Sequence, residues 1–233
     1  MSEPAADGSL RVLVRLLHLA SPTLPIGAYS YSQGLEWVVG ESMVHDAAST
    51  ERWIGDLLDH VMPHGEAAVT WRLLQAARAL DWPACIHWNA WFLASRETAE
   101  LSAETEQMGQ SLAQLLDHLD LIDVDARGML PMLAPITLPA AFSLAARGFE
   151  LAPKAALTGY LWAWLENQVL CAMKSVPLGQ VAGQKLLLRL GARIPRIVTE
   201  AQRMPDHDVT NFAPGLALAS SMHETQYTRL FRS

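Results

Sequence analysis

The sequence predicts an all-α fold, a multi-helix bundle that spans residues 1–233 as a single domain. Apolar residues recur three and four positions apart along most of the chain, which is the spacing of one helix face. No run alternates apolar and polar residues as a half-buried strand does, and no Asn-Gly pair marks a hairpin. Proline and glycine separate the periodic segments, as expected where helices begin and end.

In the first half of the chain, the pattern predicts helices over residues 10–20, 29–39, 50–62 and 66–80, one that starts near 81, and one over 97–119. Ser9 is the expected N-cap of the first helix, after a short flexible N-terminus over residues 1–8. The helix over 66–80 is apolar on more than one side, which favours a central position. The helix over 97–119 has a narrow apolar stripe, and its face with Glu100 and Glu104 is expected to be solvated.

The second half begins with a proline-rich stretch. Prolines 131, 135 and 139 predict an extended connection over residues 130–139, because proline cannot continue a regular helix. Further helices are expected over residues 140–148, 154–175, 178–190, 196–203 and 215–230, with a loop over 205–211. Gly179 and Gly183 on one helix face would allow a neighbouring helix to approach closely.

Charge and hydropathy argue against a nucleic-acid-binding or membrane protein. The chain has 17 Lys and Arg against 24 Asp and Glu, a net charge of −7, and no basic cluster to neutralise phosphates. Hydrophobic residues make up 51% and charged residues only 18%, so the chain has either a large Ala-rich core or apolar surface left for a protein partner. The most apolar window, residues 157–173, is broken by a polar cluster, and the acidic start is unlike a secretory signal.

The two cysteines, Cys85 and Cys171, are far apart in the sequence, and each lies in an apolar helical run. Free thiols in a reducing compartment are the simple interpretation, and one disulfide is the alternative. We therefore expect a cytoplasmic protein.

No motif for catalysis or metal binding stands out. Residues 179–185, GQVAGQK, come nearest to a phosphate-binding loop, but the glycines are one residue too close and no hydroxyl follows the lysine. Glu36, Glu166 and Glu224 lie in apolar surroundings, where a carboxylate can act as an acid or base or be a structural group. His207 lies between two aspartates in a predicted loop, where it could bind a cation or form an exposed polar turn.

Polar and aromatic residues on otherwise apolar helices point instead to protein contacts. His223 lies on the apolar face of the last predicted helix, where a core or interface histidine is expected. Lys174 near the end of its helix either complements the negative helix C-terminus or contacts a partner. The chain finishes with an aromatic and cationic set of the kind that anchors interfaces: Tyr227, Arg229, Leu230, Phe231 and Arg232. The tail over residues 227–233 is expected to be either docked or loose, and its deletion to abolish partner binding while the melting temperature stays nearly unchanged.

Three segments resemble the UreF-type urease accessory proteins. They are LLHLASPTLPIGAYSYSQGLEW at residues 16–37, ENQVLCAMKSVPLGQVAGQK at 166–185 and ASSMHETQYTRLFRS at 219–233. The first and last are the most specific, and the first departs mildly at Ala28, where the family usually has glycine. The resemblance covers essentially the whole chain, although residues 84–153 carry little of it.

The resemblance implies an all-α homodimer that acts in the maturation of the nickel enzyme urease. Such proteins bind a UreD/UreH-type accessory protein and, through that assembly, recruit the GTPase UreG, so that nickel reaches apo-urease. The implied role is a scaffold or chaperone that regulates the GTPase or guides nickel. It implies no catalytic centre and no tightly bound cofactor, with nickel passing through the assembled complex.

The resemblance also implies which residues contact partners. A UreD/UreH-type protein would bind the tail residues Tyr227, Arg229, Phe231 and Arg232, and His223 belongs to the same partner-binding set. The same surface or its support would contain Tyr29, Ser30, Gln33 and Glu36. The GTPase-facing surface or the dimer interface would lie near Lys174, Gln180 and Gln184. Two alternatives stay open, namely a direct nickel carrier that uses His207 or His223, and a helical enzyme with a buried carboxylate.

Overall fold

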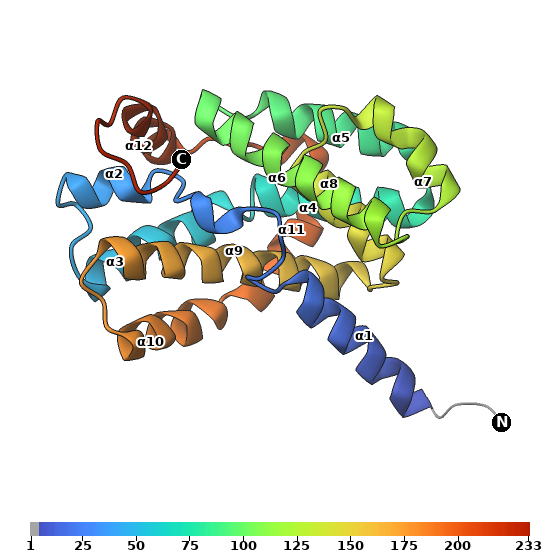
Figure 1. The fold of residues 1–233 in the computed structure, drawn as a ribbon, viewed down its shortest axis with the longest axis horizontal. Helices are drawn as coiled ribbons and strands as arrows, with labels where there is room; N and C mark the ends of the chain where they lie inside the picture. Colours follow the sequence, from blue (N-terminus) through green and yellow to red (C-terminus); the bar gives the residue numbers. More distant parts are fainter. Residues whose placement is uncertain (1–4) are drawn as a thin grey trace.

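The protein is described by a computed structural model that covers residues 5–233, and Figure 1 shows its helices in chain order. The first half contains α1 (Ala5–Leu19), η1 (Ala28–Ser30), α2 (Leu35–Gly40), α3 (Ala47–Asp56), η2 (Leu57–Val61), α4 (Glu66–Ala79), α5 (Trp82–Ala94) and α6 (Ala99–His118). The second half contains α7 (Val124–Met129), η3 (Leu130–Leu133), α8 (Leu138–Gly148), α9 (Pro153–Ser175), α10 (Gln180–Gly191), α11 (Ile194–Arg203), η4 (Asp206–Asp208) and α12 (Pro214–Glu224). Residues 5–233 contain no β-strand, so the predicted all-α fold is confirmed.

The centre of the bundle consists of α4 and α9. α4 packs against α5, α8, α9 and α11, while α9 also contacts α1, α2, α3 and α10. Alanines such as Ala67, Ala68 and Ala77 are fully buried on α4, because small side chains let several helices approach one axis. The predicted central position of residues 66–80 is confirmed. The buried side chains form one connected core that reaches from Leu19 to Phe231.

Local sequence explains where several helices begin. Asp46 accepts a hydrogen bond from the Ser49 backbone N–H at 2.7 Å, and the Ser49 hydroxyl accepts one from the Asp46 N–H at 3.0 Å. This reciprocal pair satisfies two backbone donors at the start of α3. Asp81, Thr98 and Asp123 each cap the next helix in the same general way, by accepting a hydrogen bond from a backbone N–H three residues on.

Two glycines allow close approach of neighbouring chain segments. A Cβ on Gly183 would lie 2.4 Å from Sδ of Met173, so the expected close packing of α10 on α9 is confirmed there. It is wrong for Gly179, which has open space around it. A Cβ on Gly109 would lie 2.2 Å from the carbonyl oxygen of Ile136, so α6 lies directly against the segment that enters α8.

Two predicted helices near the N-terminus differ from the structure. α1 begins at Ala5, so Ala5–Gly8 of the segment expected to be flexible form its first turns, and residues 1–4 lie outside the described residues. The single helix predicted over 29–39 is wrong. Gln33 and Gly34 have φ angles of 53° and 76°, which break the chain into η1 and the shorter α2.

Two later segments also differ. The stretch over 130–139 is partly helical, since η3 follows α7 directly and α8 already starts at Leu138. The last predicted helix is too long, because α12 ends at Glu224 and the following residues turn back.

Cys85 and Cys171 are buried free thiols, as expected. Among the described helices none combines the length and the hydropathy that a membrane span requires.

Candidate partner-binding site

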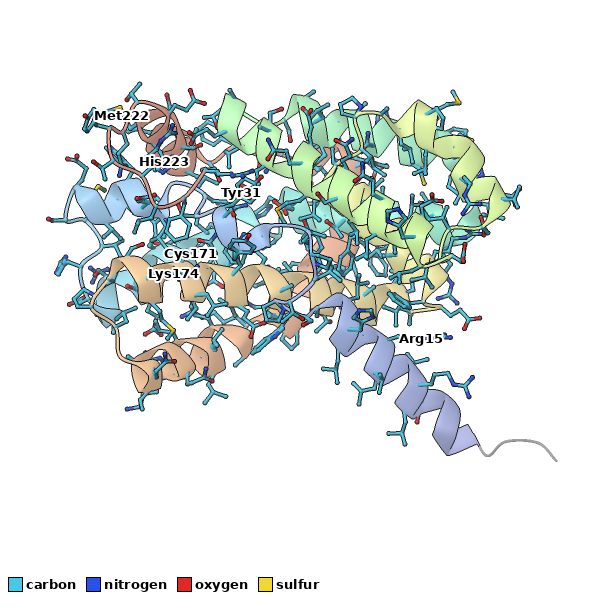
Figure 2. All side chains as sticks on the ribbon, in the orientation of Figure 1. Arg15, Tyr31, Cys171, Lys174, Met222 and His223 are labelled. Atoms are coloured by element: carbon cyan, nitrogen blue, oxygen red, sulfur yellow. The ribbon has the colours of Figure 1, made fainter. Side chains whose placement is uncertain are left out.

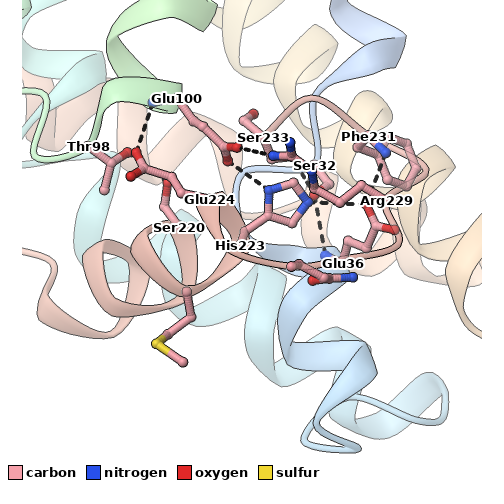
Figure 3. A network of polar contacts seen from close by, with 12 residues as sticks. Ser32, Glu36, Thr98, Glu100, Ser220, His223, Glu224, Arg229, Phe231 and Ser233 are labelled. Atoms are coloured by element: carbon pink, nitrogen blue, oxygen red, sulfur yellow. Dashed lines mark hydrogen bonds and ion pairs between the residues drawn. The ribbon is translucent and has the colours of Figure 1, made fainter.

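Residues 225–233 include the predicted tail over 227–233 and are called the tail from here on. They fold back from α12 onto the segment that joins η1 to α2 (Figure 3). The backbone N–H of Arg232 donates to the carbonyl of Ser30 at 2.7 Å. The carbonyl of Ser233 in turn accepts hydrogen bonds from the N–H and the hydroxyl of Ser32, both at 2.6 Å. Of the two alternatives for the tail, the structure has the docked one.

Glu36 is the main anchor of the tail. Its carboxylate accepts the backbone N–H of Leu230 at 2.7 Å and that of Phe231 at 2.9 Å. The Glu36 side chain is only 8% exposed, so little water competes for these bonds. Hydrogen bonds to a charged acceptor are about twice as strong as neutral ones. Glu36 therefore supports the tail from beneath and is not itself open to a partner.

His223 joins the end of α12 to the anchor. Its Nδ1 lies 2.7 Å from a carboxylate oxygen of Glu100, and its Nε2 lies 3.2 Å from one of Glu36 (Figure 3). Arg229 of the tail donates to the other Glu100 oxygen at 2.5 Å. The His223 side chain is fully buried. Of the core and interface alternatives for His223, the chain has the core one, but the apolar face expected around the ring is wrong, because the ring contacts two carboxylates.

A second carboxylate on α6 anchors the tip of the tail. Glu104 accepts a hydrogen bond from the Ser233 hydroxyl at 2.7 Å and one from the Gln33 amide at 2.8 Å. Burial raises the pKa of Glu104 to about 7, although both hydrogen bonds act to lower it. Nearby, Tyr160 donates to Glu66, which also pairs with Arg96 at 3.5 Å. This buried polar cluster supports the tail from inside the bundle.

Polar residues of α9 hold the other side of the same segment. The Tyr31 carbonyl accepts hydrogen bonds from the Asn167 amide at 3.0 Å and from Sγ of Cys171 at 3.4 Å. Nζ of Lys174 lies 5.6 Å from the Phe231 ring centroid and 5.9 Å from that of Tyr29, within the range of cation–π attraction. Figure 2 labels Tyr31, Cys171 and Lys174 where α9 approaches this segment.

Of the three large apolar or aromatic side chains of the tail, one is buried and two face outward. Phe231 is 5% exposed and belongs to the core, whereas Tyr227 is fully exposed and Leu230 is 71% exposed. A segment whose backbone is fixed, but whose apolar side chains remain in water, has the character of a binding surface.

The structure brings most of the sequence-predicted residues together at this site. Those in direct contact with the tail or part of it are Ser30, Glu36, Lys174, His223, Tyr227, Arg229, Phe231 and Arg232. Tyr29 faces Lys174, which in turn faces Phe231. Gln33 lies beneath them, where its amide oxygen also accepts the Trp164 N–H at 2.8 Å. Gln180 and Gln184 are exposed on α10, which lies beyond α9 as seen from the tail (Figure 1). They form no part of this site.

Three residues that contact the tail were missed by sequence reasoning, namely Ser32, Glu100 and Glu104. The expectation that Glu100 and Glu104 lie on a solvated face is wrong, because the tail and Gln33 cover them. The sequence held a signal for this contact, since Glu100 and Glu104, one helical turn apart, are opposite in charge to Arg229 and Arg232 at the end of the chain.

The docked tail also changes the expectation that its deletion leaves stability unaltered, since deletion would expose buried carboxylates and remove Phe231 from the core.

The geometry gives little support to the two alternatives, a buried catalytic carboxylate and a nickel-binding histidine. Glu166 is half-buried, and burial raises its pKa, but Glu224 is exposed and accepts the Glu100 N–H at 3.3 Å. His207 is 82% exposed and lies 3.7 Å from Asp208. Within residues 5–233, no group of three or more His, Cys, Asp or Glu side chains is arranged to hold a metal ion.

Comparison with known proteins identifies the family. The UreF family model matches residues 44–191. A urease accessory protein UreF from Azoarcus sp. is 52% identical over 228 residues, which is 97% of each chain. Another UreF, from Janthinobacterium sp., is 48% identical over 223 residues, or 96% of this chain and 99% of its own. Relatives this similar over nearly the full length show that the chain belongs to the UreF family of urease accessory proteins.

Proposed function

We propose that this chain is a cytoplasmic scaffold that binds a UreD/UreH-type accessory protein and, through that assembly, recruits a UreG-type GTPase for nickel insertion into apo-urease. Membership of an accessory-protein family supports a role in urease maturation. The observation that carries the proposal is the tail, which is fixed by its backbone while Tyr227 and Leu230 remain exposed.

The fixed tail favours binding for an energetic reason. A loose segment must lose conformational freedom when it binds, at a cost of roughly 1–2 kcal/mol per residue. Glu36, Ser30 and Ser32 already hold the tail backbone, so most of that cost is met during folding. Tyr227 and Leu230 then offer apolar area to a UreD/UreH-type partner without further ordering of the backbone.

A neighbouring surface is available for the GTPase. Lys174 is exposed and lies over the rings of Phe231 and Tyr29, so a cation and an exposed aromatic ring stand beside the tail. We assign this patch to GTPase contact and regulation. Because it adjoins the surface for the UreD/UreH-type protein, one partner can complete the binding site of the other.

We assign the homodimer interface to α1. Leu10, Leu13, Val14 and Leu17 are all about half or more exposed and recur at the spacing of one helix face. α1 projects from the body of the molecule in Figure 1. A second copy of this chain is the proposed occupant, and Leu13→Glu should give a monomer in light scattering where the wild type is a dimer. Nickel is cargo in this proposal, and the chain holds no tightly bound cofactor.

The decisive experiment measures the affinity of the purified chain for a UreD/UreH-type protein. The double variant Tyr227→Ala, Leu230→Ala should bind at least about tenfold more weakly, because it removes the exposed apolar side chains of the tail. Its melting temperature should match the wild type, since both side chains are exposed. Val124→Ala, which is 84% exposed on α7, is the matched control. Undiminished affinity of the double variant would refute the proposed surface.

A nickel titration of the isolated chain separates the carrier alternative from the scaffold. A submicromolar site that is lost in His207→Ala would favour a direct carrier. His223 is an unsuitable ligand, because both of its ring nitrogens already face carboxylates.

A further inference from the structure

His223 is a buried histidine between two carboxylates. Its ring is completely shielded from solvent, and Nδ1 and Nε2 face Glu100 at 2.7 Å and Glu36 at 3.2 Å. An ionised carboxylate can only accept hydrogen bonds, whereas a neutral imidazole donates from one nitrogen and accepts at the other. Both contacts are therefore favourable only when the ring carries two N–H groups, or when a carboxylate supplies the missing proton.

The charges around the ring also favour an imidazole that carries two N–H groups. α2 contributes Glu36, α6 contributes Glu100, and the tail contributes Arg229, which pairs with Glu100 at 2.5 Å. α12 contributes Glu224, whose carboxylate accepts the Glu100 backbone N–H near the surface. With His223 protonated, two cations balance the two buried carboxylates. After loss of that proton, one ring lone pair would face a carboxylate inside the protein, where an unpaired charge is costly.

The tail depends on this balance, because the Glu36 carboxylate that faces His223 also accepts the Leu230 and Phe231 N–H groups. We propose that the tail is a proton-operated latch, docked when His223 is protonated and released when His223 loses its proton. The docked tail then binds one proton more than the released tail, so raising the pH favours release. The latch is a property of the isolated chain, and only its effect on partner binding rests on the proposed function.

Glu104 acts in the same direction. It faces Glu66 and Arg96 inside the bundle, Gln33 beside α2, and Ser233 of the tail. Burial raises the pKa of Glu104 to about 7, although the hydrogen bond from Ser233 acts to lower it. Ionisation of Glu104 above that pH places a charge in a buried position, and this charge is better solvated once the tail has left. Both groups therefore hold the tail at lower pH and weaken it as the pH rises.

The experiment is a pH titration of the full-length chain by NMR. The ring nitrogens of His223 report its protonation, and the backbone amides of Leu230 and Phe231 report the docked tail. We expect both ring nitrogens to be protonated while the tail is docked. We expect the two amide signals to move to unstructured values over the same pH range in which His223 loses its proton. Amides that stay constant while His223 titrates, or a ring with one bare nitrogen in the docked state, would overturn the latch.

Two variants and a control test whether His223 causes the pH response of the tail. His223→Gln should reduce the pH response of the tail amides to the part near pH 7 that Glu104 contributes. His207→Gln, at an exposed histidine, should leave the full response intact. If His223→Gln does not fold, Glu100→Gln provides the second test. That change removes one of the two charges that retain the proton, so tail release should move to lower pH. An unchanged pH response in Glu100→Gln would contradict the proposal.

The same titration with a UreD/UreH-type protein tests the consequence for binding. Affinity should fall about tenfold per pH unit above the transition, because the tail must take up one proton to return to the docked state that binds the partner. If the amides respond but the affinity does not, the latch stands and the tail is not the partner surface. If the partner binds through Tyr227 and Leu230 but the amides do not respond, the proposed function stands and the latch is wrong.

Discussion

The sharpest test of the anchor is Glu36→Gln. Two backbone N–H groups, of Leu230 and Phe231, and one imidazole nitrogen converge on the Glu36 carboxylate. Glutamine keeps one acceptor oxygen but replaces the other with an NH₂ group. That NH₂ donor would face a backbone N–H of the tail, which is also a donor. Hydrogen bonds to charged groups contribute about 1.5–3 kcal/mol each. Losing one such bond and the charge that faces His223 should destabilise the fold by about 3 kcal/mol.

Thermal unfolding checks this magnitude. For a domain of this size, about 1 kcal/mol corresponds to about 2–4 °C, so the melting temperature should fall by about 6–12 °C. Glu41→Gln, at an exposed position just after α2, is the matched control and should change the melting temperature by less than about 2 °C. A Glu36→Gln protein as stable as the control would refute the claim that this carboxylate holds the tail.

Three further predictions concern pH, packing and the surface. Glu104→Gln should stabilise the protein at pH 8 by up to about 3 kcal/mol, measured by denaturant unfolding, and by less at pH 5. A rise in pKa from 4.5 to about 7 makes the wild type lose that stability as the pH rises through this window. Gly109→Ala should lower the unfolding free energy by more than about 2 kcal/mol, because its Cβ meets backbone, whereas Gly128→Ala, in open space, should not. Lys174→Ala should weaken pull-down of the GTPase complex but cost the fold only about 0.5–1 kcal/mol, since the lysine of these cation–π pairs is exposed; a large loss of stability without a binding defect would support a purely structural lysine.

Local pattern was enough to predict the long helices. α4, α6 and α9 begin and end within a few residues of their predicted bounds, because apolar periodicity and capping residues are local signals. The interruption at Gln33 and Gly34 was not visible in that pattern. A Cβ on Gly34 would lie 3.0 Å from the Cβ of Ala219, so contact with a distant helix requires the glycine there.

The site was only partly predictable for a related reason. Aromatic and cationic residues marked the tail, and the resemblance placed Tyr29, Ser30 and Glu36 beside it. Where the tail turns back depends on carboxylates far away in the sequence: Glu36 is 195 positions from Phe231, and Glu100 is 129 positions from Arg229. Helical periodicity carries no information on such pairings, so Glu100 and Glu104 looked like solvated residues.

In the proposed function, this chain acts by assembling other proteins. The most direct measurement is co-purification of a UreG-type GTPase with the chain, with and without a UreD/UreH-type protein present. We predict that the GTPase is retained only when the UreD/UreH-type protein is bound, and that the Tyr227→Ala, Leu230→Ala variant loses both. Retention of the GTPase by that variant at wild-type level would contradict the account.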